Sequence, residues 1–144
     1  DHDEHKERRV KYMALHIPEA VIYARFNDSD ASGYISTISY FSYMEEARTR
    51  FFDSLQRYID QEEVSFIVAS AQCEYDRCER VKEQLSVTTS ITQVGTKSFH
   101  LAHTISNTQS GDVIARGKAV IVCFNFQKQQ TVLIPDSLRA YLKT

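Results

Sequence analysis

The sequence is poor in the residues that build nucleotide-binding loops and disulfide frameworks. Its 144 residues include four glycines, two prolines, three cysteines and no tryptophan. The glycines lie too far apart for GxGxxG, Walker A or GxSxG motifs, which excludes nucleotide-binding folds and serine hydrolases with a nucleophile elbow. An odd cysteine count without a CxxC pair favours reduced thiols that pack in the core, although Cys73 and Cys78 could pair. The third cysteine is Cys123.

Long apolar runs and an excess of one charge are also absent. No apolar segment approaches the roughly 20 residues that cross a bilayer, and the start, DHDEHKERRV, is too charged for a secretory signal. The net charge of −2 gives no basic surplus for binding nucleic acid. We therefore expect a cytoplasmic protein with neither a membrane nor a nucleic-acid partner, while removal of an upstream segment stays open.

The length and the 42% apolar content fit one compact domain. Residues 1–17 are expected to form a charged N-terminal arm and residues 18–144 the single domain. In the arm, His2 and His5 have no third ligand nearby, so a solvated tail is favoured over a metal site.

Histidines further along the chain give no metal motif either. His100 and His103 share a predicted strand at an odd spacing and so point to opposite faces, and HExxH is absent. We expect neither a metal ion nor another cofactor.

Hydrophobic patterning predicts a strand, a turn, a long helix, four long strands and a short helix. Apolar residues alternate over Val21–Phe26, and Asn27–Gly33 carries the residues that turns prefer. From about Thr37 to Leu55, apolar residues recur at the i, i+4, i+7 spacing of one helical face. That face comprises Tyr40, Phe41, Met44, Ala47, Phe51 and Leu55. The later elements are strands at Val64–Tyr75, Gln84–Val94, Lys97–Ser106 and Val113–Phe126, and a helix at Ser137–Lys143.

Turn signals between these strands favour antiparallel pairing. Gly95 and the segment Asn107–Gly111 make connections short enough for hairpins. A long helix with one apolar face must bury it on a sheet, so we predict an α+β fold with a curved antiparallel five-stranded sheet wrapped around one long central helix. Exposed sheet edges favour a homodimer or homotetramer.

Two carboxylates, Asp28 and Asp30, stand beside Gly33 just ahead of the long helix. A helix N-terminus offers unpaired N–H groups and a positive dipole end to an anion or a polarised carbonyl. The spacing has two interpretations: an Asx-rich turn with a helix cap, or a catalytic carboxylate for acyl chemistry.

The segment DSDASGYISTISYFSYMEEAR, Asp28–Arg48, resembles the DxDxxGhh…Y(F/L)xYxEEAR signature of the 4-hydroxybenzoyl-CoA thioesterase branch of the hotdog-fold acyl-CoA thioesterases. The resemblance covers roughly residues 21–142. It implies a hotdog fold, an acyl-CoA substrate and a catalytic carboxylate at Asp30, with Asp28 supporting the turn. It continues through EY at 74–75, VGTKSFHLAH at 94–103, DVIARGKAVIVCF at 112–124 and the closing IPDSLRAYL.

The resemblance also implies further site residues. The backbone N–H that polarises the thioester carbonyl falls near Thr37, and Lys97 and Ser98 match a position that contacts the phosphates of coenzyme A. Thr96 stands where some members carry an arginine. Many members have His-Val-Asn-Asn where this chain has YIST at 34–37, so hydrogen bonding around the acyl carbonyl must differ.

Other residues have a structural interpretation beside a functional one. Tyr40 and Tyr75 are candidates for lining the substrate pocket, but core packing explains both, as it does Phe41, Tyr43 and Met44. Arg48 is expected to form an ion pair. Lys97, Arg116 and Lys118 fit either phosphate contacts or a solvated strand surface.

The implied reaction is hydrolysis of a thioester. The helix N–H groups would stabilise the oxyanion while Asp30 attacks the carbonyl or activates a water. One alternative is a non-catalytic module that binds acyl-CoA or an acyl-carrier protein. Another is a hotdog dehydratase, which needs a histidine where none lies between His16 and His100.

Overall fold

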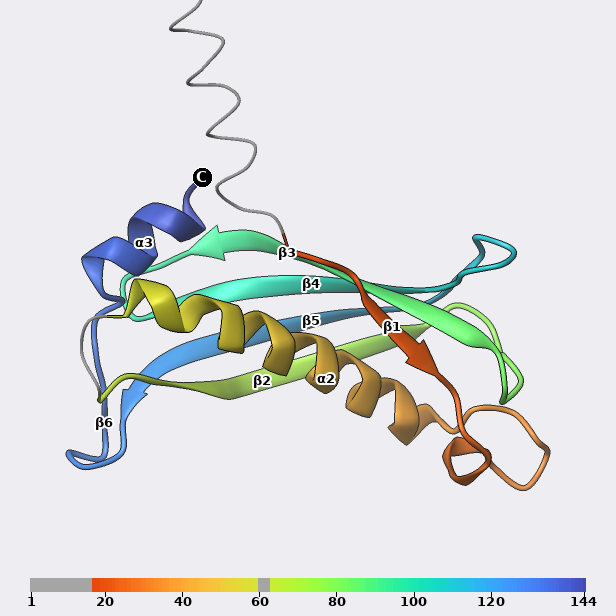
Figure 1. Ribbon diagram of the computed structural model, residues 1–144. Coiled ribbons are helices and arrows are strands. Elements are labelled where there is room, and N and C mark those ends of the chain that lie inside the picture. Colours follow the sequence, from red (N-terminus) through yellow and green to blue (C-terminus); the bar gives the residue numbers. More distant parts are fainter. Residues whose placement is uncertain (1–16, 60–62) are drawn as a thin grey trace, which may run out of the picture.

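The computed structural model describes residues 17–59 and 63–144, which form an α+β fold (Figure 1). Its antiparallel sheet has the strand order β1-β3-β4-β5-β2, with the short β6 paired to β5. The strands are β1 (Ala20–Tyr23), β2 (Ser65–Tyr75), β3 (Gln84–Val94), β4 (Ser98–Asn107), β5 (Val113–Asn125) and β6 (Gln130–Thr131). The helices are η1 (Phe26–Asp28), α2 (Thr37–Leu55), η2 (Gln56–Tyr58) and α3 (Asp136–Leu142), where η marks a 3₁₀ turn.

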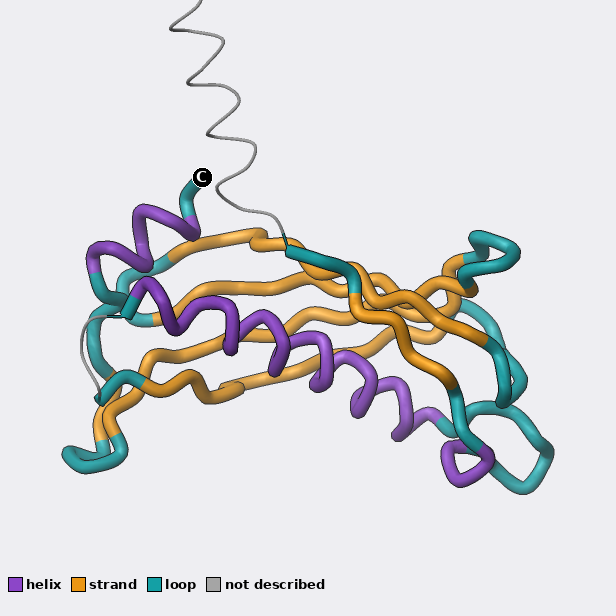
Figure 2. The backbone as a smooth tube through the Cα atoms, in the orientation of Figure 1, coloured by secondary structure: helices purple, strands orange, loops and turns teal. Residues whose placement is uncertain are grey.

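Helix α2 lies lengthwise across one face of the sheet, which curves around it (Figure 1, Figure 2). The N-terminus of α2 is at the end where β2 finishes, and its C-terminus is at the end that carries α3. The predicted sheet wrapped around a single long helix is therefore confirmed.

The amino-acid pattern of α2 explains both its start and its orientation. Ser36 caps the helix: its Oγ accepts the N–H of Ser39 at 3.4 Å. The buried residues recur with the helical period and face the sheet, while the charged residues between them face solvent. Those buried residues are Ser39, Tyr40, Tyr43, Met44, Ala47, Arg48, Phe51 and Leu55.

The strands pair as the hairpin turns predicted. Antiparallel β3 and β4 meet at Val94 and Phe99, and antiparallel β4 and β5 include the pair His103 and Gly117. Along β4, buried and half-buried residues alternate, so one face of the strand packs on α2. Gly117 lies directly under Met44, whose Sδ occupies the space that a Cβ would need.

Several boundaries differ from the sequence-based expectation. The first strand spans Ala20–Tyr23, because the chain turns into η1 after Ala24; Phe26, expected as a strand residue, is 76% exposed. Strand β6 was not expected. Phe41 is 39% exposed, so its assignment to the core is wrong.

The cysteines are all free thiols. Cys123 is buried and Cys73 is half-buried, as expected for packing residues, but Cys78 is exposed, so its assignment to the core is wrong. The proposed arm, residues 1–17, lies almost wholly outside the described residues. Within those residues, no helix has the length and apolar character to span a membrane.

Candidate active site

A tight hairpin joins η1 to the start of α2 and carries both candidate acids. Ser36 N–H donates to the Asp28 carbonyl at 2.8 Å, and Asp30 N–H donates to the Tyr34 carbonyl at 2.7 Å. Gly33 forms the turn with φ +83°, a conformation that favours glycine. The acids therefore belong to one compact unit with the helix N-terminus.

The Asp30 side chain is exposed and bound to its own turn. Its Oδ1 accepts the N–H groups of Ser32 at 2.8 Å and Tyr34 at 3.2 Å. Its Oδ2 accepts no hydrogen bond from any residue in the described ranges. One carboxylate oxygen is thus held by the backbone, and the other is available to a ligand or a water.

The Asp28 side chain points the other way, toward α2. Its Oδ2 accepts the Tyr43 hydroxyl at 2.8 Å and the Arg25 N–H at 3.0 Å. Burial and the hydrogen bond to Asp28 raise the pKa of Tyr43 above its usual range, so the phenol stays protonated and donates. This geometry fits the supporting role that the motif implies for Asp28.

The first turn of α2 has free amide groups. Within the described residues, no acceptor lies on the N–H of Thr37 or Ile38, and both residues are exposed. At the other side of this turn, the Tyr75 hydroxyl donates to the Thr37 carbonyl at 2.8 Å. The amides are thus available to an oxyanion, and β2 fixes the turn that presents them.

Two candidate substrate residues lie together beside this turn. The Tyr40 and Tyr75 rings are 5.5 Å apart between centroids at 47°. Tyr40 is 2% exposed, and its hydroxyl has no partner among the described residues; burial, followed by the nearby Glu79 charge, raises its pKa to about 12. Tyr75 is 41% exposed, so the expectation of a core aromatic is wrong for it.

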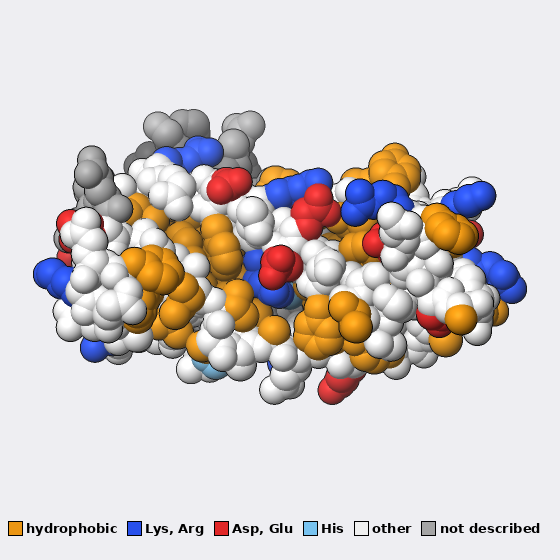
Figure 3. Space-filling view, turned by 90° about the horizontal axis from the view of Figure 1, so that it is seen from below, with side chains coloured by type: hydrophobic (Ala, Val, Ile, Leu, Met, Phe, Trp, Pro, Cys, Tyr) orange, Lys and Arg blue, Asp and Glu red, His pale blue; other side chains and the backbone are white. Residues whose placement is uncertain are grey.

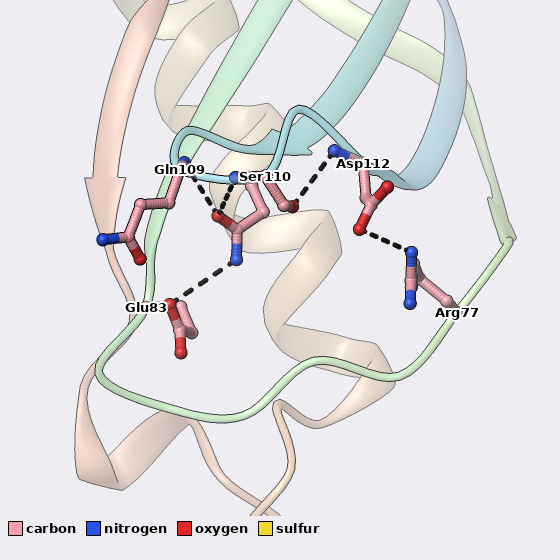
Figure 4. Close-up of polar contacts among 6 residues, drawn as sticks. Arg77, Glu83, Gln109, Ser110 and Asp112 are labelled. Carbon is pink, nitrogen blue, oxygen red and sulfur yellow. Dashed lines mark hydrogen bonds and ion pairs between the residues drawn. The ribbon is translucent and has the colours of Figure 1, made fainter.

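The loop after β2 supports the hairpin from one side. Ile35 N–H donates to the Glu79 carbonyl at 2.8 Å, and the Arg80 guanidinium lies over the Tyr34 ring at 4.9 Å. The loop is in turn tied to the β4–β5 turn (Figure 4), where Arg77 pairs with Asp112 at 2.8 Å. A second contact between this loop and the β4–β5 turn joins Asn107 Nδ2 to Glu83 Oε2 at 3.5 Å. Within the β4–β5 turn, Asn107 Oδ1 accepts the N–H groups of Gln109 and Ser110.

Within one chain, the structure does not bring Lys97 and Ser98 to the end of the molecule where α2 begins (Figure 1). They lie at the β3–β4 turn, where Lys97 lines a cavity of about 430 Å³ with Pro135 and Asp136 near α3. Helix α2 has 19 residues and is about 28 Å long, and α3 ties this turn to the C-terminal end of α2, since Arg139 donates to the Thr96 carbonyl and Ser137 to the Tyr58 carbonyl.

Two other basic residues are on the outer face of the sheet. Arg116 and Lys118 line a cavity of about 270 Å³ with Gln72 and Glu74. Arg116 donates to Asp76 at 2.9 Å, so a carboxylate already holds its guanidinium.

A buried polar row under the middle of α2 was missed by sequence reasoning. Arg48 is 4% exposed and its Nη1 is 3.4 Å from His103 Nε2; His103 Nδ1 is 2.9 Å from Thr89 Oγ1. Since Arg48 only donates, His103 is neutral with its proton on Nδ1. No carboxylate in the described residues pairs with Arg48, so the expected ion pair is wrong.

The histidines are arranged as their spacing predicted. His103 faces the core and His100 is half-buried on the opposite face of β4. Within the described residues, no three His, Cys, Asp or Glu side chains are grouped to hold a metal ion.

The long helix wrapped by a curved antiparallel sheet defines a hotdog fold, and comparison with known proteins gives the family. The model of the thioesterase-like superfamily matches residues 24–142, and the chain belongs to this superfamily. It is a thioester hydrolase with the hotdog fold.

Individual relatives agree with this assignment. The chain is 27% identical over 121 residues to the acyl-CoA thioester hydrolase YbgC of Escherichia coli O6:H1, covering 82% of this chain and 90% of YbgC. It is 30% identical over 98 residues to the uncharacterised protein YsmA of Bacillus subtilis, covering 68% of this chain and 66% of YsmA. Among solved structures, the gentisyl-coenzyme A thioesterase BH1999 superposes with a TM-score of 0.74 at 28% identity, covering 87% of this chain and 99% of BH1999.

Proposed function

We propose that Asp30 and the N-terminus of α2 carry out the hydrolysis of an acyl-CoA thioester by this protein. The observation that carries the proposal is one hairpin that presents an exposed carboxylate and leads directly into the N-terminus of α2; among the described residues, neither Asp30 Oδ2 nor the first two helix N–H groups has a partner. The amides of Thr37 and Ile38 stabilise the oxyanion, since preorganised donors act where charge develops in the transition state. Asp30 attacks the carbonyl carbon or removes a proton from the attacking water.

Aromatic residues beside the helix end are proposed to contact the acyl group. Tyr40 carries a buried hydroxyl without a partner in the described chain, and such a group is satisfied by a water or by a ligand. The Tyr75 hydroxyl is already used by Thr37, so its exposed ring contributes the contact.

We propose that the active unit is a homodimer or a homotetramer. Among the described residues, β2 pairs only with β5 and so forms an edge of the sheet. Apolar side chains gather on the side of the molecule seen in Figure 3. Val68 and Tyr75 on β2 are each 41% exposed, and Phe41 of α2 is 39% exposed. Pairing of two β2 edges would satisfy their backbone groups and cover this apolar surface.

The same symmetry supports Lys97 and Ser98 as phosphate contacts. A two-fold axis perpendicular to the sheet, between two antiparallel β2 edges, reverses the direction of the second chain. The β3–β4 turn of that chain then lies at the end of the assembly where α2 of the first chain begins. Lys97 is exposed and free to meet a phosphate there.

A cytoplasmic location is also proposed. All three cysteines are free, one of them exposed, which fits a reducing compartment.

The experiment is release of free thiol from a panel of acyl-CoAs by the wild type, Asp30→Asn and Asp53→Asn. Asp53 is an exposed carboxylate on α2 and serves as the matched control. We expect Asp30→Asn to lose about 100-fold or more in kcat, as removal of a proton-transfer group does, and Asp53→Asn to match the wild type. The exposed thiol of Cys78 is subtracted in a reaction without substrate.

Near-normal turnover by Asp30→Asn would refute the assignment of Asp30. Binding of acyl-CoA by the wild type without thiol release from any member of the panel would favour the binding module instead.

A further inference from the structure

Asp28 and Asp30 leave the same short segment on opposite sides. Ser29 between them has extended backbone angles, φ −87° and ψ 154°, and side chains alternate along an extended chain. Asp28 is half-buried against α2, and Asp30 is exposed. The Asp-x-Asp spacing therefore gives each acid a different environment.

Asp28 fastens this segment to α2 through two separate groups. Its carboxylate accepts the Tyr43 hydroxyl at 2.8 Å, and its carbonyl accepts Ser36 N–H at 2.8 Å and Ser39 Oγ–H at 3.1 Å. Tyr43 is 6% exposed and lies in the second turn of α2, on the face that packs against the sheet. The contact from Tyr43 is a hydrogen bond to a carboxylate, the stronger kind, and it joins the loop to a buried ring.

We propose that Tyr43 and Asp28 are positioning residues for Asp30. The inference rests on the proposed function, because it concerns where Asp30 stands relative to the amides of Thr37 and Ile38. The Asp28 backbone fixes the loop at the helix cap, and the Tyr43 hydroxyl fixes the direction in which the loop continues to Asp30. A catalytic group displaced by about 1 Å loses up to about 100-fold in rate.

The first test is kinetic and uses Tyr43→Phe, which removes the hydroxyl and keeps the ring. We expect kcat on the best acyl-CoA to fall about tenfold with KM unchanged. Asp28→Asn keeps an oxygen that accepts the Tyr43 hydroxyl, so it should retain most of kcat, whereas Asp28→Ala should behave like Tyr43→Phe. Tyr141→Phe, a change of the same kind near the C-terminus in α3, is the control and should leave kcat unchanged.

A double variant separates positioning from general loss of structure. If Tyr43 acts through Asp30, adding Tyr43→Phe to the Asp30→Asn variant should lower kcat no further. A further tenfold loss in that background would overturn the proposal, as would wild-type kcat in Tyr43→Phe.

Hydrogen exchange tests the same contact without any substrate. The N–H groups of Ser32 and Tyr34, which donate to Asp30, should exchange about tenfold faster in Tyr43→Phe and at the wild-type rate in Tyr141→Phe. Unchanged exchange in Tyr43→Phe would overturn the proposal. If the wild type releases no thiol from any acyl-CoA, the proposed function fails on its own, and exchange alone decides whether Tyr43 holds the loop.

Discussion

Acidification should destabilise the protein through His103, which lies under the middle of α2. Burial, followed by the charge of Arg48, lowers the pKa of His103 from 6.5 to about 4. In the unfolded chain the imidazole binds a proton near pH 6.5, but in the folded chain it resists protonation. The unfolded state therefore binds more protons between these values, so stability is complete above about pH 6.5 and is lost as the pH falls toward 4.

The size of the effect follows from the difference in pKa. Between pH 7.5 and pH 5.0 the linkage relation gives a loss of about 2 kcal/mol in the free energy of unfolding, and about 3 kcal/mol by pH 4. The assay is urea unfolding followed by circular dichroism at several pH values. His103→Gln, which keeps a neutral polar side chain at this position but cannot titrate, is the comparison.

The informative quantity is the difference in unfolding free energy between wild type and His103→Gln as a function of pH. Carboxylates and other histidines titrate in both proteins and cancel in this difference. We expect the wild type to lose about 2 kcal/mol relative to the variant on going from pH 7.5 to pH 5.0. A difference that does not change with pH would refute the assignment of a buried neutral imidazole.

Three further predictions concern packing, capping and thiol exposure. Gly117→Ala should lower the unfolding free energy by about 1–3 kcal/mol in urea titrations, because the new methyl group enters the space of Met44 Sδ; an unchanged midpoint would contradict this packing. Ser36→Ala removes the cap of α2 and should cost about 1 kcal/mol in the same assay, whereas an exposed position such as Thr49→Ala should cost little. In the native protein, a thiol reagent at pH 8 should label Cys78 rapidly and Cys123 only after unfolding, because Cys123 is buried with its pKa raised to about 11; equal rates would contradict this.

Much of the fold could be predicted because buried positions are occupied by apolar residues, which recur along the sequence at the spacing of a helix or a strand. The apolar positions of α2 recur every three or four residues, and the observed helix begins at Thr37 and ends at Leu55, as expected. Strand β3 also matches its expected bounds. The period fails at Phe26, since alternation continues in the sequence while the backbone has already turned into η1.

The candidate site was predictable only in part, because its central contact joins distant parts of the chain. The spacing of Asp28 and Asp30 alone favoured a turn with a helix cap over a catalytic carboxylate, and only the resemblance to the thioesterase family reversed that preference. Tyr43 was interpreted as a packing residue, and it is buried, but its hydroxyl bond to Asp28 spans 15 positions and has no local signal. The sequence predicted a turn over Asn27–Gly33, and only the structure shows the extended conformation of Ser29 that sends the two acids to opposite sides.

Arg48 shows how two signals in one residue can disagree. Its charge suggested the surface and an ion pair, yet it follows Met44 by four positions and so belongs to the buried face of the helix. The helical period of the apolar residues predicts the observed position: the Arg48 guanidinium is buried in the core, and no carboxylate of the described residues pairs with it. An uncompensated buried charge is costly, and here a neutral imidazole accepts one of its N–H groups. Burial is the larger cause of the low pKa of His103, and the positive charge that the helical period places beside it at Arg48 lowers that pKa further by favouring the deprotonated imidazole.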